Sequence, residues 1–248
     1  MTAILLTVLG ACTLAPYIVF RIQKRLVPGI FFKIATSIFF LLTACAAAMA
    51  WPAETFEQYK HLFFFILIGQ IFGLLGDYWM DMKDMMPKDH DAYAFAGFAS
   101  FCICHLFFIA GLYRTYAAYG SGIGWKYQLI VPAAGLVLAA FVLVTEKPMK
   151  VRYGKFKGIA TTYSVIFGMS IAMALCCWLF GDNNPQALVM TIGLVIFLLS
   201  DLVLSGTIFG EGKDRPIDYA LNYLFYYGGQ FIIALSLLWI GWRVAPGA

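Results

Sequence analysis

Charged residues are scarce in this chain of 248 residues: Asp, Glu, Lys and Arg make up 12% of it, and 62% is hydrophobic. The mean hydropathy is +0.82, whereas about a quarter of the residues of a typical soluble domain are charged. So little charge excludes an ordinary soluble protein. The formal net charge of +4 resides in short loops and forms no basic patch, so we expect no nucleic-acid partner. The composition predicts a polytopic membrane protein.

Patterns typical of a metal centre are also lacking. The sequence contains three histidines, two of which, His61 and His90, are expected in loops, and this argues against a zinc hydrolase. The six cysteines all lie in apolar runs, where we interpret them as small residues that pack helices. We therefore expect neither a metal nor another cofactor.

Eight long apolar runs are present instead, and they predict an all-α bundle of eight transmembrane helices. The expected spans are 2–20, 30–50, 62–80, 92–113, 127–145, 158–180, 186–209 and 217–240. The connections are mostly short and leave no room for a soluble domain, so residues 1–248 are expected to form a single transmembrane domain. The first run lacks a basic region and continues to Phe20, which favours a membrane helix over a cleaved signal peptide.

Lysine and arginine are distributed unevenly between the two sides of the predicted bundle. Thirteen follow the odd-numbered spans or flank the next span: Arg21, Lys24, Arg25, Lys33, Lys83, Lys88, Lys147, Lys150, Arg152, Lys155, Lys157, Lys213 and Arg215. The other side has four: Lys60, Arg114, Lys126 and Arg243. Because cytoplasmic loops are enriched in Lys and Arg, we expect both termini to be non-cytoplasmic. The expected location is a bacterial inner membrane or the endoplasmic reticulum.

Two sequence matches indicate an internal duplication. Asp77 and Asp201 are 124 residues apart, half the chain length, and each follows two leucines and a small residue. The pair Phe32-Lys33 recurs as Phe156-Lys157 at the same offset, with one glycine added after the second lysine. Matches this short are common in apolar sequence, so a four-plus-four repeat and an unrepeated bundle both stay open. In a parallel repeat, the two aspartates would lie on the same side of the membrane.

Asp77 and Asp201 stand inside apolar runs long enough to cross a bilayer. A carboxylate is unfavourable there, and intramembrane acids usually mark a functional site. At 1.5 Å per helical residue, Asp77 is expected roughly 5 Å and Asp201 roughly 12 Å inside the cytoplasmic ends of their helices. Asp81 and Asp84 follow Asp77 closely, so Asp77 alone could be an interfacial residue, whereas Asp201 has no charged neighbour along its helix.

Further polar residues are expected in the same half of the membrane. Those near the cytoplasmic ends of their spans are Lys33, Tyr163, Asn222 and Tyr226, and those nearer the midplane are His105 and Gln230. Taken singly, a membrane Tyr, Asn or Gln is more often a helix-packing residue, and Lys33 could simply extend to the headgroups. Because several independent helices present polar groups to one leaflet, the set favours a shared site.

These residues and their neighbours follow one another along the chain in a characteristic order. The elements are Lys33, Gly76-Asp77, Phe95-x-Gly97-Phe98 with His105, Tyr163 with Met169, Phe197-x-x-Ser200-Asp201, and Tyr227-x-x-Gln230. Their order over most of the eight spans resembles the YhhN-like lysoplasmalogenase family of integral membrane hydrolases. The chain departs from the family pattern where Ile34 replaces a proline after Lys33 and where Tyr78-Trp79 follows the Gly-Asp pair. These departures concern the substrate more than the reaction.

The resemblance implies hydrolysis of the vinyl ether bond of a lysoplasmalogen to a fatty aldehyde and glycerophosphoethanolamine or glycerophosphocholine. Asp77 and Asp201 would be the catalytic pair. The lysophospholipid would be bound by Lys33, His105, Tyr163, Asn222, Tyr226, Tyr227 and Gln230, among membrane lipids. A vinyl ether is hydrolysed by protonation of carbon, which suits a carboxylic acid, and a second carboxylate can deprotonate the water. We expect the deeper Asp201 to be the acid and Asp77 the base.

Two other classes of protein stay open. Parallel repeats and intramembrane acids also occur in proton-coupled transporters of small molecules or lipids. A carrier needs access from both sides of the membrane, yet the polar residues here concentrate in the cytoplasmic half and leave the other half nearly bare. A structural or receptor-like bundle would leave the two aspartates without a common purpose.

Overall fold

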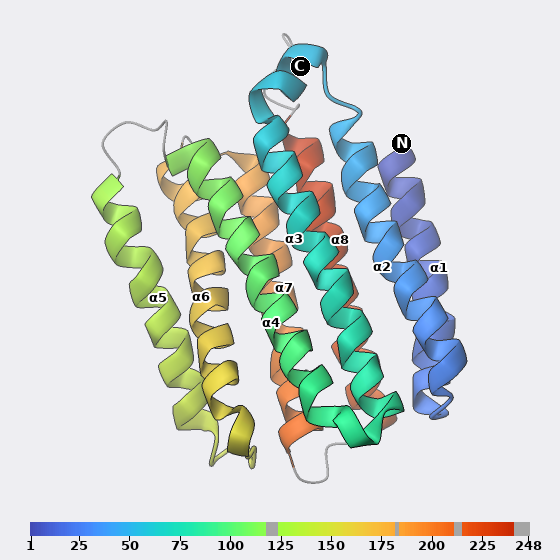
Figure 1. Cartoon of the computed structure of the whole chain (residues 1–248). Coiled ribbons are helices and arrows are strands. Elements are labelled where there is room, and N and C mark those ends of the chain that lie inside the picture. Colours follow the sequence, from blue (N-terminus) through green and yellow to red (C-terminus); the bar gives the residue numbers. More distant parts are fainter. Residues whose placement is uncertain (118–123, 182–183, 211–214, 241–248) are drawn as a thin grey trace.

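The computed structural model describes residues 1–117, 124–181, 184–210 and 215–240, and it is helical throughout (Figure 1). The helices are α1 (Thr2–Ile22), α2 (Leu26–Ala48), α3 (Ala53–Met85), α4 (His90–Leu112), α5 (Gly124–Thr145), α6 (Lys157–Phe180), α7 (Pro185–Phe209) and α8 (Pro216–Ser236). Eight helical segments are long and apolar enough to cross a membrane. The predicted all-α membrane bundle of eight helices is confirmed. Lys213, Arg243 and the C-terminal end of the predicted domain lie outside the described residues.

Helix α3 is much longer than the predicted span 62–80, with 33 residues. Its additional turns are polar, so the hydropathy falls while the helix continues, and it ends just before Pro87, which cannot extend it. Asp77 therefore lies eight residues before the end of its helix, roughly 12 Å instead of the expected 5 Å. Asp201 also lies eight residues before the end of α7. Measured from the helix ends, the predicted difference between the two aspartates is therefore wrong.

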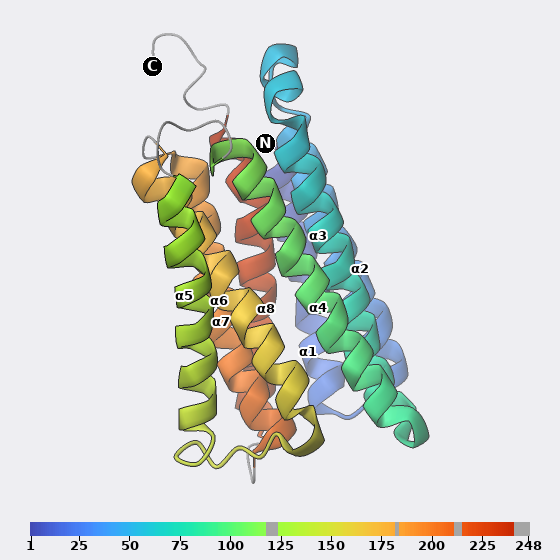
Figure 2. The same cartoon turned by 60° about the vertical axis from the view of Figure 1, so that its left-hand side comes forward.

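The helices pack as two halves of four with corresponding neighbours. In the first half α1 packs on α2 and α3 on α4, and in the second half α5 packs on α6 and α7 on α8. The halves meet through α4 with α6 and through α2 with α8, and exchange of the two halves converts each of these contacts into the other. They also meet through α1 with α8, for which α5 and α4 form no contact of similar extent in the described residues. Figure 2 shows α5–α8 on the left and α1–α3 on the right, with α4 running from the top centre to the lower right in front of α1–α3. This arrangement is the one that a four-plus-four parallel repeat produces.

Two glycines bring α7 and α8 into close contact. A Cβ atom on Gly193 would lie 3.0 Å from the carbonyl oxygen of Gly229, and one on Gly229 would lie 2.7 Å from the carbonyl oxygen of Gly193. Only glycine permits this approach, as in other membrane helix pairs. Nearer the start of α8, Asn222 donates hydrogen bonds to Ser200 of α7, the neighbour of Asp201.

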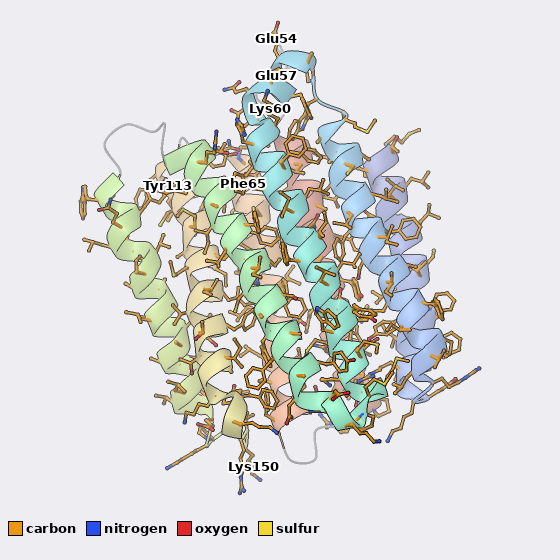
Figure 3. The ribbon with its side chains drawn as sticks, viewed as in Figure 1. Glu54, Glu57, Lys60, Phe65, Tyr113 and Lys150 are labelled. Atoms are coloured by element: carbon orange, nitrogen blue, oxygen red, sulfur yellow. The ribbon has the colours of Figure 1, made fainter. Side chains whose placement is uncertain are left out.

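The two ends of the bundle differ in charge, but neither is bare. Figure 3 shows Lys150 at one end and Glu54, Glu57 and Lys60 at the other. The second end also contains a buried hydrogen-bonded group in which Gln186 accepts a hydrogen bond from Tyr116 and donates one to Ser236. The expectation that this half is nearly free of polar residues is wrong, because the long first turns of α3 and the start of α7 bring polar groups there.

Candidate functional site

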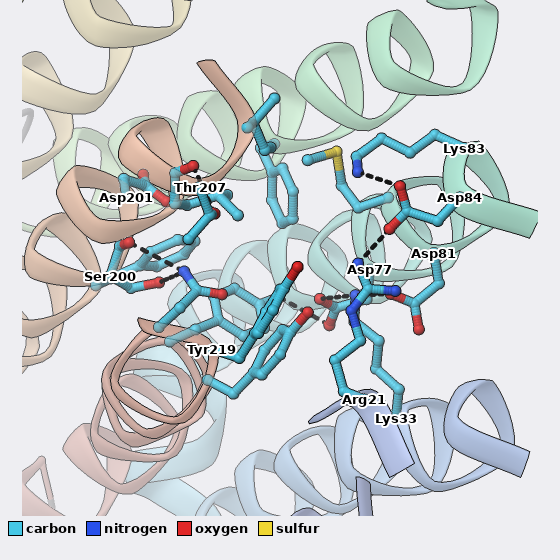
Figure 4. Close-up of a pocket in the computed structure, with 18 of the residues that line it drawn as sticks. Arg21, Lys33, Asp77, Asp81, Lys83, Asp84, Ser200, Asp201, Thr207 and Tyr219 are labelled. Carbon is cyan, nitrogen blue, oxygen red and sulfur yellow. Dashed lines mark hydrogen bonds and ion pairs between the residues drawn. The ribbon is translucent and has the colours of Figure 1, made fainter. Parts of the chain in front are cut away.

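A polar cavity of about 310 Å³ lies at the end of the bundle where α1, α3 and α7 end and α2 and α8 begin (Figure 4). Its polar lining residues include Arg21, Lys33, Asp77, Asp81, Lys83, Asp84, His90, Ser200, Asp201, Thr207, Asn222 and Tyr226. Asp77 and Asp201 thus line one cavity. Figure 4 shows Asp77 among the ion pairs of α1, α2 and α3, and Asp201 on the opposite wall beside Ser200 and Thr207.

Asp77 is 3% exposed and is surrounded by hydrogen-bond donors. Its Oδ2 atom accepts hydrogen bonds from Ser37 Oγ at 2.8 Å and from Tyr226 Oη at 2.9 Å, with Tyr227 Oη at 3.5 Å. The donors come from α2 and α8, so the tertiary packing of three helices builds this environment. Because charge-assisted hydrogen bonds of this kind satisfy an anionic oxygen, the surroundings of Asp77 match a carboxylate.

Lys33 is the cation beside Asp77, but its closer partner is Asp81. The Nζ atom of Lys33 lies 2.9 Å from Asp81 Oδ1 and 3.7 Å from Asp77 Oδ1. Tyr17 also donates to Asp81, at 3.3 Å. Lys33 is buried and serves two acids, so it compensates their charge and has little freedom to bind another anion.

A second group of charges lies closer to the cavity mouth. Asp84 accepts a hydrogen bond from Lys83 Nζ at 2.7 Å through Oδ1, and it is paired with Arg21 through Oδ2. Arg21 also lies over the ring of Tyr219, 5.5 Å from its centroid. The contact between Arg21 and Asp84 joins the end of α1 to the end of α3.

Asp201 has a different environment from Asp77. It is half-buried, and Tyr163 of α6 donates a hydrogen bond of 2.5 Å to its Oδ2 atom. Within the described part of the chain, no salt bridge reaches Asp201. The neighbouring Ser200 is fixed by Asn222, whose Nδ2 atom donates to both the carbonyl oxygen and the hydroxyl of Ser200 at 3.0 Å.

A smaller apolar cavity adjoins the polar one. It lies between α4, α5, α6 and α7, and its walls include Phe98, Leu138, Tyr163 and Phe209. Both cavities are lined by Asp201, Met80, Phe101, Leu204 and Ile208. Asp201 therefore stands at the boundary between a charged chamber and a hydrocarbon-like chamber.

Eight of the nine predicted site residues lie in or directly behind the two cavities. Five line the polar cavity: Lys33, Asp77, Asp201, Asn222 and Tyr226. Tyr163 lines the apolar cavity. Tyr227 and Gln230 lie behind Asp77, where Tyr227 contacts the aspartate and Gln230 Nε2 donates to Tyr226 Oη at 3.5 Å.

His105 lines neither of these two cavities. It is fully buried and stacks on Phe167, with 4.1 Å between the ring centroids. The prediction that it contacts the substrate therefore has no support in this geometry. The other two histidines are in helices and not in loops as predicted: His61 lies in α3, and His90 is the first residue of α4.

The sequence interpretation missed Arg21, Lys83, Asp81 and Asp84 as parts of the site. A signal was available for the acids, because positions 77, 81 and 84 share one face of any helix that continues to Pro87. Arg21 had no such signal, because it reaches the cavity only through the packing of α1 on α2 and α8. Among the described residues, no group of three or more His, Cys, Asp or Glu side chains is placed to hold a metal ion.

The sequence was compared with models of known protein families. The family model described as the YhhN family matches residues 3–237. The chain belongs to the YhhN family. Membership is consistent with a hydrolase-type membrane enzyme, and the matched region contains every residue of the two cavities. Comparisons with curated proteins and with solved structures found no match.

Proposed function

We propose that this protein is a lysoplasmalogenase, a membrane hydrolase that cleaves the vinyl ether bond of a lysoplasmalogen to a fatty aldehyde and a glycerophospho head group. One observation supports this most: Asp77 and Asp201 line the same polar cavity, and Asp201 also lines the adjoining apolar cavity. A lysoplasmalogen has a charged head, a single hydrocarbon chain and a vinyl ether where the two meet. The head group would occupy the polar chamber and the vinyl ether the boundary beside Asp201, and the apolar chamber of about 60 Å³ would take the first part of the chain.

Asp201 is the proposed proton donor. It borders the apolar chamber, and its described hydrogen bond comes from a single hydroxyl, that of Tyr163. A carboxyl group in such surroundings can be protonated and can transfer its proton to carbon. Protonation of the vinyl carbon remote from oxygen gives an oxocarbenium ion, and Asp201 becomes a carboxylate on the same wall.

Asp77 is the proposed base. Its carboxylate is held by Ser37 and Tyr226 and compensated by Lys33, so it remains an oriented acceptor. Water adds to the carbon that bears the ether oxygen and loses a proton to Asp77, which forms a hemiacetal. The hemiacetal then collapses: the Asp201 carboxylate takes the hydroxyl proton, the carbon–oxygen bond to glycerol breaks, and Asp77 gives its proton to the glycerol oxygen, so both acids return to their starting states. The products are one aldehyde and one alcohol, and the net reaction consumes one water.

The proposed orientation places this site at the cytoplasmic leaflet. The cavity lies at the end of the bundle where the basic loops are, and cytoplasmic loops are enriched in Lys and Arg. A lysophospholipid of that leaflet could present its head to the cavity without crossing the membrane. A proton-coupled carrier would also need access from the other end of the bundle, where the polar group of Gln186, Tyr116 and Ser236 lines neither cavity.

The decisive experiment compares two lipids that differ only at the ether. Purified protein is incubated with a lysoplasmalogen and with its alkyl ether analogue, and the release of fatty aldehyde is measured. Aldehyde from the vinyl ether and none from the alkyl ether is the expected result. A protein that releases aldehyde from neither lipid, but moves either one across a vesicle membrane in response to a proton gradient, would be the carrier.

A further inference from the structure

We propose that Arg21 and Lys83 form a phosphate-binding subsite at the mouth of the polar cavity, and that Asp84 is the counter-ion displaced by the phosphate. The inference rests on the proposed function, because the phosphate is that of a lysophospholipid head group. It assigns the principal contact with the head group to Arg21 and Lys83 in place of Lys33.

The Asp84 carboxylate lies between two cations, where a phosphate could take its place. Asp84 bridges the two cations through separate oxygens, Oδ1 to Lys83 and Oδ2 to Arg21 (Figure 4). A phosphodiester presents two non-bridging oxygens that can replace both contacts, and guanidinium groups bind phosphate in this two-oxygen manner. Both cations line the cavity, so a ligand inside it can reach them.

Lys33 is poorly placed for the same task. It lies between Asp81 and Asp77, and the rings of Tyr17 and Tyr223 are each 5.7 Å from its ammonium group. Its withdrawal toward a phosphate would leave two buried acids without a cation, which is strongly unfavourable.

Asp84 is the most easily displaced acid of this wall. Its side chain is 23% exposed, against 4% for Asp77 and 7% for Asp81. A phosphodiester would take over both cations, and the displaced Asp84 carboxylate would turn toward water, which its greater exposure favours. The buried pairs of Lys33 with Asp77 and Asp81 stay intact.

The distance along α3 fits the shape of the ligand. Asp84 lies on the same face of α3 as Asp77, seven residues further, which is roughly 10 Å along the helix axis. A phosphate at the position of Asp84 thus leaves the glycerol backbone to extend inward, toward the two catalytic aspartates. Tyr219 packs against Arg21 and orients its guanidinium at the mouth.

The test measures binding and needs no turnover. The full-length protein in lipid nanodiscs is titrated with two radiolabelled ligands, 1-O-hexadecyl-glycerophosphocholine and 1-O-hexadecylglycerol, which lacks the phosphate. Arg21→Gln and Lys83→Gln should each weaken binding of the phosphate ligand at least about tenfold, the effect of one lost charge-assisted hydrogen bond, and leave binding of the alkylglycerol unchanged. Lys60→Gln, an exposed lysine at the opposite end of the bundle, is the control and should change neither.

Two further variants test the proposal in case the glutamine variants fold poorly. Arg21→Lys keeps the charge and should lose affinity for the phosphate ligand only. Asp84→Asn removes the competing carboxylate and should tighten binding of that ligand. Equal loss of both ligands, unchanged binding in the Arg21 and Lys83 variants, or weaker phosphate binding in Asp84→Asn would overturn the proposal. The two ligands are alkyl ethers and are not hydrolysed, so this test is independent of turnover. A preference for the phosphate ligand, in a protein that releases no aldehyde from a lysoplasmalogen, would refute the proposed reaction and leave the phosphate subsite in place.

Discussion

The walls that contain Asp77 and Asp201 occupy corresponding places in the two halves of the molecule and have opposite character. Both aspartates lie eight residues before the end of their helix, in α3 and α7. The positions that follow differ: Asp81, Lys83 and Asp84 in α3 correspond, 124 residues later, to Ser205, Thr207 and Ile208 in α7. The first wall is a network of ion pairs, and the second is weakly polar and faces an apolar cavity.

Because of this difference, the same short sequence motif can supply two chemical roles. Asp77 receives hydrogen bonds from Ser37 and Tyr226 and lies near Lys33, whereas the described polar contact of Asp201 is with Tyr163. Acid and base are distinguished in carboxylate pairs by their environments, and here the environments come from different neighbours of equivalent helices. The proposed assignment of Asp201 as acid and Asp77 as base thus rests on surroundings and no longer on depth.

The largest expected effect is on turnover. Asp77→Asn and Asp201→Asn should each lower kcat/KM for a lysoplasmalogen by at least about a hundredfold, because the amide keeps the shape and loses proton transfer. Aldehyde release by each purified variant measures this, and its elution profile reports folding. Asp91→Asn is the control, since Asp91 is exposed and outside both cavities. Near-full activity of either test variant would refute the two-carboxyl mechanism.

A second comparison concerns stability. Lys33→Met leaves Asp77 and Asp81 buried without their cation and should lower the free energy of unfolding by about 3–5 kcal/mol. Lys157 stands at the corresponding position of the second half, where it pairs with Glu146 at the surface. Lys157→Met should therefore leave stability unchanged. Thermal unfolding in detergent distinguishes the two, and equal shifts would mean that the walls do not differ as described.

Replacement of the tyrosines that contact the two acids should lower activity less than replacement of the acids themselves. Tyr163→Phe removes the described hydrogen bond to Asp201 and should lower kcat about tenfold. Tyr226→Phe should have a weaker effect, because Ser37 still donates to Asp77. Steady-state kinetics on the vinyl ether substrate measures both. A larger loss for Tyr226→Phe would reverse the comparison.

The last prediction concerns the orientation of the protein in the membrane and involves no change in reaction rate. Cysteines are introduced at Lys150 and at Lys60, which lie at opposite ends of the bundle. From the distribution of Lys and Arg, a membrane-impermeant thiol reagent should label Lys150→Cys from the cytoplasmic side and Lys60→Cys from the other. The reverse pattern would place the polar cavity at the opposite leaflet.

A bundle of eight membrane helices follows from the sequence alone, because apolar length and scarce charge leave few alternatives. The sequence also indicated the two intramembrane aspartates, since a carboxylate inside an apolar run is conspicuous without any structure. It did not give the end of α3, where hydropathy falls several residues before the helix stops. Asp81 and Asp84 were missed as site residues for that reason.

Which polar residues contact one another depends on how the helices pack. The packing of α1, α2, α3 and α8 places Lys33 between two acids and brings Arg21 to Asp84, and the packing of α4–α7 forms the apolar cavity beside Asp201. It also separates His105 from both cavities. Helical periodicity says which side chains share a face of one helix, but hydrogen bonds and ion pairs depend on which face meets which neighbour.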